Sequence, residues 1–196
     1  MVALAKEKVI TIPKALMYEM LDGIVVPYRG YQKVLAKKLN VEDIMGSSGL
    51  QSLVISIILE YLMTNFKNYR FMSSEVGLHL NHKNNLAADI AMFPKSALLQ
   101  LRESNYVEIP PRAVIEIDTK ADQSVFVVES EYFNRKTQKL LDFGVELVVW
   151  FFTADQKILI ARQNQPWLVT HFDYDFDFLG TPMNLKKVLS EEGLDF

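Results

Sequence analysis

A row of charged side chains follows the apolar part of one short segment, residues 112–120, which read RAVIEIDTK. The β-branched and apolar residues in this segment predict a strand. Because side chains of a strand point alternately to opposite faces, we expect Glu116, Asp118 and, if the strand extends that far, Lys120 on one face. Burying charge is costly unless the charge is paired or binds a metal. The segment therefore predicts either a row of ion pairs or a metal site.

A further carboxylate, Asp89, lies between two alanines in a second predicted strand, residues 86–93. Its small neighbours leave room for a ligand to approach. If the strands form a meander, Asp89 and Glu116 come from neighbouring strands and their side chains can meet. Carboxylates with a lysine nearby suit a hard divalent ion such as Mg²⁺, and the lysine can orient an attacking water or stabilise the charge that develops on a phosphorane. By composition alone, a structural salt bridge is the alternative.

The elements that would position these residues follow from turn signals and apolar periodicity. Asp22-Gly23 between two apolar runs predicts a hairpin, with a helix over 31–39 after it. Ser48 is the expected N-cap of a long buried helix that ends near residue 66. The later part of the chain predicts strands at 71–80, 86–93 and 113–118, a loop at 95–111, a helix at 130–143 ended by Gly144, strands at 146–153, 158–162 and 167–172, and a closing helix.

This order predicts an α/β (α+β) protein with a mixed-sheet core of helix, strand, strand, strand, helix and strand. We expect a single domain over 1–196. An N-terminal extension of hairpin and helix would occupy 1–45, and the core, with added C-terminal antiparallel strands, would occupy 46–196. Lys136 is expected at the edge of the apolar stripe of the helix over 130–143.

Composition narrows the functional classes. Of the 196 residues, 49% are hydrophobic and none is cysteine, which excludes disulfides, thiolate nucleophiles and cysteine-based metal centres. The net charge of −3 argues against coating nucleic acid by bulk electrostatics, although a local basic face is compatible with it. The sequence has no apolar run long enough for a signal peptide or a membrane span, so the expected location is the cytoplasm, without a membrane partner.

Several segments, taken in order over nearly the whole chain, resemble the Uma-two family, bacterial proteins inferred to be endonucleases of the PD-(D/E)XK, or restriction-endonuclease-like, superfamily. The segments are YEMLDGIV at 18–25, ADIA at 88–91, PRAVIEI at 111–117, Lys136, LDFGVE at 141–146, the strand that ends at Trp150, and LGTPMNL at 179–185. The resemblance implies a hydrolase that cleaves DNA phosphodiester bonds with Mg²⁺, or with Mn²⁺ in its place. Asp89 and Glu116 would be the two acids of the motif and would bind the metal, and a homodimer would fit the superfamily.

The chain departs from the superfamily pattern in two places near these acids. Ala88 stands where proline is usual, which leaves the metal-binding acid unchanged. Asp118 stands where the motif has lysine. Either the motif is shifted to Asp118-Thr119-Lys120, with Asp118 as a third metal ligand, or the lysine role has moved to Lys136 on the helix. Strand alternation favours Lys120. Gln51 lies near the place of the family's usual histidine.

Other side chains with metal-binding chemistry have simpler explanations. His79 and His82 are three residues apart, but on a strand and a turn they cannot share a face well. Asp173, Asp175 and Asp177 alternate with aromatic residues, as expected for the solvent side of a strand.

Two functions are compatible with these patterns. The first is a Mg²⁺-dependent endonuclease, in which local cations meet DNA phosphates, the candidates being Lys33, Lys37, Arg135 and Lys139. The second is a nucleic-acid-binding or structural protein that retains the nuclease fold without turnover. The acidic net charge and the displaced lysine speak for the second function, while the resemblance over nearly the whole chain makes the endonuclease the prediction and the second function its alternative.

Overall fold

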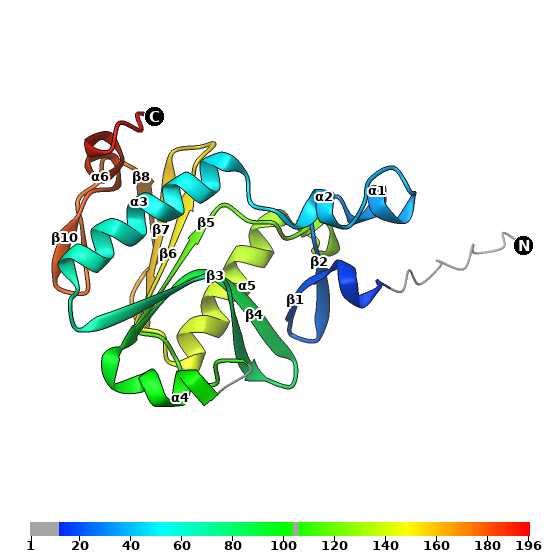
Figure 1. The fold of residues 1–196 in the computed structure, drawn as a ribbon, viewed down its shortest axis with the longest axis horizontal. Coiled ribbons are helices and arrows are strands. Elements are labelled where there is room, and N and C mark those ends of the chain that lie inside the picture. Colours follow the sequence, from blue (N-terminus) through cyan, green and yellow to red (C-terminus); the bar gives the residue numbers. More distant parts are fainter. Residues whose placement is uncertain (1–11, 104–105) are drawn as a thin grey trace, which may run out of the picture.

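A mixed β-sheet between two helical layers forms the centre of the computed structural model, which describes residues 12–103 and 106–196 (Figure 1). Over these residues the sheet has eight strands: seven follow the order β2-β1-β4-β5-β6-β7-β8, and the eighth, β3, pairs with β4 off this path. The strands of this sheet are β1 (Met17–Leu21), β2 (Ile24–Pro27), β3 (Tyr69–Asn81), β4 (Asn84–Pro94), β5 (Ala113–Ile117), β6 (Leu147–Phe152), β7 (Lys157–Arg162) and β8 (Leu168–His171). A separate two-stranded sheet pairs β9 (Phe176–Phe178) with β10 (Thr181–Met183).

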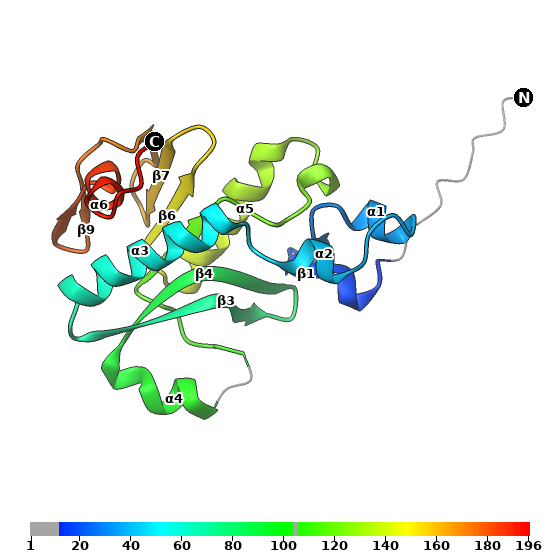
Figure 2. The same ribbon diagram turned by 45° about the horizontal axis from the view of Figure 1, so that its top comes forward.

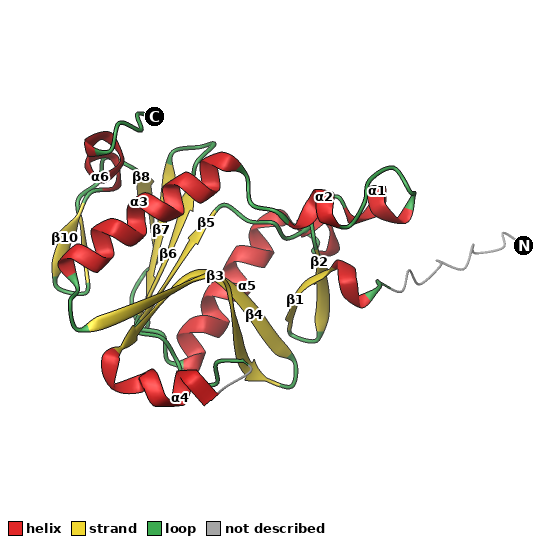
Figure 3. Ribbon diagram, viewed as in Figure 1, coloured by secondary structure: helices red, strands yellow, loops and turns green. Residues whose placement is uncertain are grey.

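The main helices lie on opposite faces of the sheet (Figures 1 and 2). The helices α3 (Gly49–Asn65) and α6 (Leu185–Glu191) share one apolar core with side chains such as Ile90 and Ile115. The helix α5 (Glu129–Phe143) shares the other core with side chains such as Val114 and Trp150. The smaller helices are α1 (Tyr31–Leu35), α2 (Glu42–Met45) and α4 (Leu98–Glu103), with 3-10 turns at Lys14–Leu16, Lys95–Ala97 and Gln123–Val125 (Figure 3).

The predicted α/β class and core order are confirmed as α3, β3, β4, β5, α5, β6. The strands β3, β4 and β5 form an antiparallel meander, and β6 runs parallel to β5 after the crossover helix α5. Parallel neighbours need such a crossover because a tight turn can only reverse the chain. The expected C-terminal antiparallel additions are β7 and β8.

Local signals located the ends of most elements to within about two residues. Asp22 (φ 53°) and Gly23 (φ 78°) form the hairpin turn with positive φ at both positions, and the side chain of Ser48 caps α3 by accepting a hydrogen bond from Gln51 N at 3.1 Å. Gly144 (φ 112°) ends α5 in the left-handed conformation. The predicted helix over 31–39 is too long, since α1 ends at Leu35. The predicted loop at 95–111 contains a 3-10 turn and α4.

The predicted N-terminal extension is joined to the core by its hairpin. β1 pairs with β4 at Met20 and Asn85, so the hairpin adds two strands to the main sheet. It meets the edge of β4 beyond the segment that pairs with β5, which is Ile90–Met92. Residues 1–11 of the predicted extension lie outside the described residues. None of the helices in the described ranges is long and apolar enough to cross a membrane.

Candidate active site

The predicted pair of acids meets on neighbouring strands. Ile90 on β4 is opposite Ile115 on β5, and the same antiparallel register brings Asp89 opposite Glu116. Both side chains are buried, with 4% and 1% of their surface exposed. Asp89 Oδ2 accepts a hydrogen bond of 2.7 Å from Ile117 N, which holds its carboxylate against the end of β5. The expectation that these two acids come together is confirmed.

A bulge in β3 lies directly beside Asp89. The pairing of β3 with β4 shifts between Ser73–Ile90 and Val76–Ala88, so two residues of β3, Ser74 and Glu75, oppose one residue of β4. Both bulge residues have positive φ, 72° and 57°. Bulges occur often next to active sites, where they redirect side chains. Here the bulge directs Glu75 towards Lys120, with which it forms an ion pair.

Lys136 contacts Glu116 directly. Its side chain is completely buried, and Nζ lies 3.1 Å from Glu116 Oε1 and 3.1 Å from Glu19 Oε2. Nζ also donates a hydrogen bond of 2.7 Å to the carbonyl oxygen of Ala87. The prediction that Lys136 lies at the edge of the apolar stripe of α5 is wrong, because the ammonium group is enclosed between the helix and the sheet.

Glu19 completes this buried cluster and was not among the site residues predicted from the sequence. Its Oε2 accepts a hydrogen bond of 3.1 Å from Ala87 N, while Lys136 Nζ binds Ala87 O. Ala87 pairs with Gly77 of β3 on one edge of β4. On the other edge it lies between the residue that pairs with β1 and those that pair with β5, so the two charged side chains satisfy the backbone groups that face this gap. A signal existed in the sequence: Glu19 is a charge in the middle of a short apolar strand that leads into a tight turn.

Aromatic rings surround the ammonium group of Lys136. Nζ lies 5.7 Å from the ring centroid of Tyr18, 5.8 Å from that of Tyr132 and 5.4 Å from that of Trp150. Ring faces attract a cation at such distances. Burial disfavours the charged lysine, but Glu116 and Glu19 outweigh burial and raise its pKa above the ordinary value. Lys136 is therefore a fixed positive charge inside the protein.

Three acidic side chains, those of Glu19, Asp89 and Glu116, share the ammonium group of Lys136 in this cluster. Burial raises the pKa of Glu116 to about 8, although Lys136 opposes the shift. Burial also raises the pKa of Asp89, against the hydrogen bond from Ile117 N. Glu19 Oε1 and Glu116 Oε1 are buried without a hydrogen-bond partner, although Lys136 provides an ionic contact to Glu116 Oε1. The cluster would accept further positive charge.

Asp118 and Lys120 do not continue the row of Glu116. β5 ends at Ile117, and Asp118 has a positive φ of 54°, so the predicted alternation along 113–120 is wrong beyond the strand. The carboxylate of Asp118 accepts hydrogen bonds from Thr153 N at 2.9 Å and Thr153 Oγ1 at 2.7 Å. Lys120 Nζ donates to Met45 O at 3.2 Å in addition to its ion pair with Glu75. Asp118 and Lys120 therefore anchor the segment that follows β5 to neighbouring segments of the protein.

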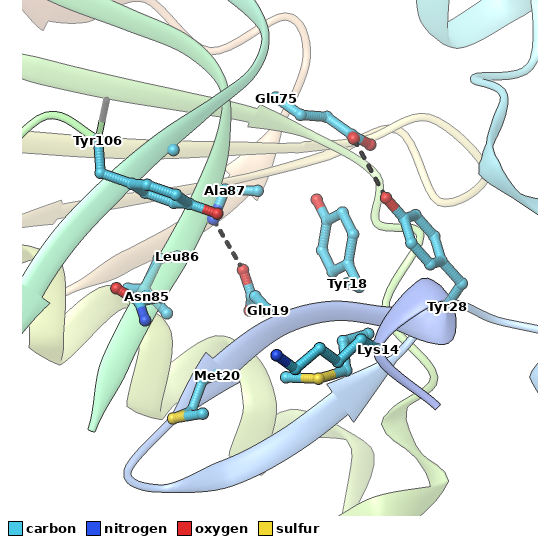
Figure 4. Close-up of a pocket in the computed structure, with 12 residues that line it drawn as sticks. Lys14, Tyr18, Glu19, Met20, Tyr28, Glu75, Asn85, Leu86, Ala87 and Tyr106 are labelled. Carbon is cyan, nitrogen blue, oxygen red and sulfur yellow. Dashed lines mark hydrogen bonds between the residues drawn. The ribbon is translucent and has the colours of Figure 1, made fainter. Parts of the chain in front are cut away.

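A cleft of about 800 Å³ opens beside Gln51, which contacts Asp89, between the segment that precedes α3 and the β6–β7 turn. Gln51, Asp118 and Lys120 line it, and Arg29 and Lys157 contribute further positive charge. A pocket of about 580 Å³ lies on the side of Glu19 and contains Tyr18, Tyr28 and Tyr106 (Figure 4). Figure 4 shows Glu75 above this pocket with the hydroxyl of Tyr28 directed to its carboxylate, and the two groups are 3.4 Å apart.

The donor atoms around Asp89 fit a magnesium ion. Asp89 and Glu116 supply carboxylate oxygens, and the carbonyl oxygen of Ile117 lies at the same place, because Gln51 Nε2 contacts both that oxygen and Asp89. Mg²⁺ takes one or two carboxylates and keeps several waters. Within residues 12–103 and 106–196, nowhere do three histidine, cysteine or acidic side chains gather so that they could hold a metal by themselves. A site of two carboxylates, a carbonyl and waters is thus the arrangement that these residues suit.

The other residues considered for DNA or metal binding are spread over the surface. Arg135 lies 3.6 Å and Lys139 lies 2.9 Å from Asp22, so both cations are paired with the hairpin turn. Lys33 and Lys37 are exposed. The three acids of 173–177 have separate neighbours: the carbonyl of Asp173 and the carboxylate of Asp175 bind Asn184, and Asp177 pairs with Arg162.

The comparisons with known proteins identify the fold. No protein-family model matches the chain, and no curated protein matches it. The chain does superpose on the crystal structure described as "a putative nuclease belonging to DUF820" from Anabaena variabilis, with a TM-score of 0.62 and 15% identity, over 88% of this chain and 89% of that one. The protein therefore has a restriction-endonuclease-like α/β fold. DUF820 is the Uma-two family, so the resemblance seen in the sequence is confirmed at the level of the fold.

Proposed function

We propose that the protein is a metal-dependent endonuclease that hydrolyses DNA phosphodiester bonds, of the PD-(D/E)XK type. The observation that carries the proposal is the buried pair Asp89 and Glu116, which lie opposite each other on neighbouring strands, with Asp89 in contact with Gln51 on the wall of a cleft. Burial raises the pKa of both acids, and over residues 12–103 and 106–196 the ammonium group of Lys136 is the one cation in contact with Glu116. Such a pair favours a divalent cation as its partner. The nuclease fold of the structural neighbour is consistent with this proposal.

In this proposal Asp89, Glu116 and the carbonyl oxygen of Ile117 hold the metal. A bound Mg²⁺ would polarise the phosphoryl oxygen and lower the pKa of a coordinated water. Asp118 is outside the proposed ligand set, because both of its carboxylate oxygens are engaged by Thr153.

We assign the lysine of the site to Lys136, in place of the Lys120 that strand alternation favoured. Lys136 Nζ lies 3.1 Å from Glu116 Oε1, whereas Lys120 is paired with Glu75 on the bulge. Lys136 is completely buried, so it acts through Glu116 and is a positioning residue. It holds the carboxylate in place, and Glu19 and Ala87 hold Lys136 in turn. Arg29 and Lys157 on the cleft wall are cations placed to meet a DNA phosphate.

Nicking of supercoiled plasmid DNA tests the proposed function. We expect the protein to convert supercoiled plasmid to open circles with Mg²⁺ or Mn²⁺, and excess EDTA to abolish the conversion because it removes the ion. The assay should use the full protein chain, follow the DNA forms on agarose gels and include single-stranded DNA as a second substrate. If no metal supports cleavage of either substrate and calorimetry detects no bound Mn²⁺, the nuclease proposal fails. The chain is then better described as a nucleic-acid-binding or structural protein that retains the nuclease fold without catalytic activity.

A further inference from the structure

Gln51 occupies the space beside Asp89 and the carbonyl oxygen of Ile117, two of the three groups that are proposed to hold the ion. It lies in the first turn of α3 and has 5% of its surface exposed. Its side-chain nitrogen Nε2 donates to Ile117 O at 2.7 Å and lies 3.3 Å from Asp89 Oδ2 and 3.5 Å from Asp89 Oδ1. One amide nitrogen is thus surrounded by two carboxylate oxygens and a carbonyl oxygen. These are the oxygen ligands that Mg²⁺ and Mn²⁺ take in proteins.

The chemistry of the neighbours fixes which end of the carboxamide points inward. Asp89 Oδ2 and Ile117 O can only accept hydrogen bonds from Gln51, so the NH₂ group faces them and the amide oxygen faces away. The backbone also holds this residue, since Gln51 N donates to the capping Ser48 Oγ at 3.1 Å. The amide satisfies the hydrogen bonds of the acceptors, but it brings no formal charge to a cluster in which acids outnumber the ammonium group.

We propose that the Gln51 amide is a placeholder for the metal, and that a divalent ion binds Asp89 only after the Gln51 side chain has moved its nitrogen away from Asp89 and Ile117 O. This inference rests on the proposed function. Gln51 lines the cleft, so its side chain has open space on that side into which it can turn. The contacts that the nitrogen makes to a carboxylate and a carbonyl are lost when the ion enters. Gln51 therefore lowers the affinity of the site for the ion, so that the ion binds weakly.

Shortening Gln51 tests the placeholder role through metal binding alone. Calorimetric titration with Mn²⁺, without DNA, should compare the wild type with Gln51→Ala and Gln51→Ser. We expect each short variant to bind Mn²⁺ roughly tenfold more tightly, because the ion no longer has to displace hydrogen bonds to a charged acceptor. Gln138→Ala is the matched control: Gln138 is an exposed glutamine whose amide donates to Asp142, and its variant should bind Mn²⁺ as the wild type does. Asp89→Asn should abolish binding.

The outcomes separate this inference from the proposed function. If the wild type binds Mn²⁺ and both short variants bind it equally well or more weakly, Gln51 is a bystander or a ligand, and the placeholder inference fails while the metal site stands. If the wild type and both short variants bind no Mn²⁺, although circular dichroism and thermal melting show that they are folded, the metal site itself fails and the inference fails with it. Tighter binding by the variant that folds, whichever of the two it is, supports the inference.

Discussion

Glu116→Gln should reduce metal-dependent plasmid nicking by roughly a hundred- to a thousandfold. A catalytic metal stabilises the transition state by several kcal/mol, and each factor of ten in rate corresponds to about 1.36 kcal/mol. Glutamine keeps the size of the side chain and removes the charge that would hold the ion. Asp89→Asn should lower the rate to a similar extent, because the two acids face each other and act on the same ion. Initial rates of open-circle formation at saturating Mg²⁺ provide the measurement.

A surface carboxylate supplies the matched control for this prediction. Glu146 is half exposed and pairs with Arg112 far from the acids, so Glu146→Gln should nick DNA at the wild-type rate. The variants should also be compared by thermal melting. Burial raises the pKa of Glu116 to about 8, so a neutral glutamine suits that environment and the variant should remain folded. Wild-type nicking by folded Glu116→Gln would show that this acid has no part in the reaction.

Lys136→Met should cost about 3–5 kcal/mol of unfolding free energy. The ammonium group is the partner of Glu19 and Glu116, and its removal leaves two carboxylates buried with no positive charge against them. It also leaves the carbonyl of Ala87 without its hydrogen bond. Urea denaturation monitored by tryptophan fluorescence measures the loss, because Trp150 lies 5.4 Å from the ammonium group.

Two further variants show whether this loss belongs to the buried cluster. Lys139 lies one turn towards the C-terminal end of the same helix, is about one-third exposed and pairs with Asp22, so Lys139→Met should change stability by about 1 kcal/mol or less. Adding Glu19→Gln and Glu116→Gln to Lys136→Met should restore much of the stability, because the unpaired charges are then gone. If Lys136→Met is as stable as Lys139→Met, or if the triple variant gains nothing, the cluster does not hold the fold as described.

The acid pair could be predicted from sequence because it depends on local rules. Strand alternation placed the charge of Glu116 opposite to Ile115 and Ile117, and the meander of consecutive strands brought Asp89 beside it. The same alternation failed two residues later. Asp118 adopts a left-handed conformation that depends on its bonds to Thr153, a residue 35 positions away, and nothing near Asp118 in the sequence indicates that contact.

The rest of the site depends on contacts between distant segments. Glu19 reaches the cluster because the N-terminal hairpin pairs with β4 where β5 no longer does, and pairing between strands so far apart has no local signature. Lys136 was predicted at the edge of the apolar stripe because periodicity alone cannot show that two buried carboxylates on the facing strands contact its ammonium group. Gln51 was noted because it lies near the place of the family's usual histidine, but its contact with Asp89 depends on how α3 lies on the sheet.

The location of Mn²⁺ in a crystal soaked with the ion tests the central claim most directly, since manganese can be identified by its anomalous scattering. The account predicts a manganese peak bounded by the carboxylates of Asp89 and Glu116 and the carbonyl oxygen of Ile117, with the Gln51 amide nitrogen turned away and Lys136 still against Glu116. A fully soaked crystal in which Gln51 Nε2 keeps its place between Asp89 and Ile117 O, with manganese absent from these acids or bound elsewhere, would contradict it.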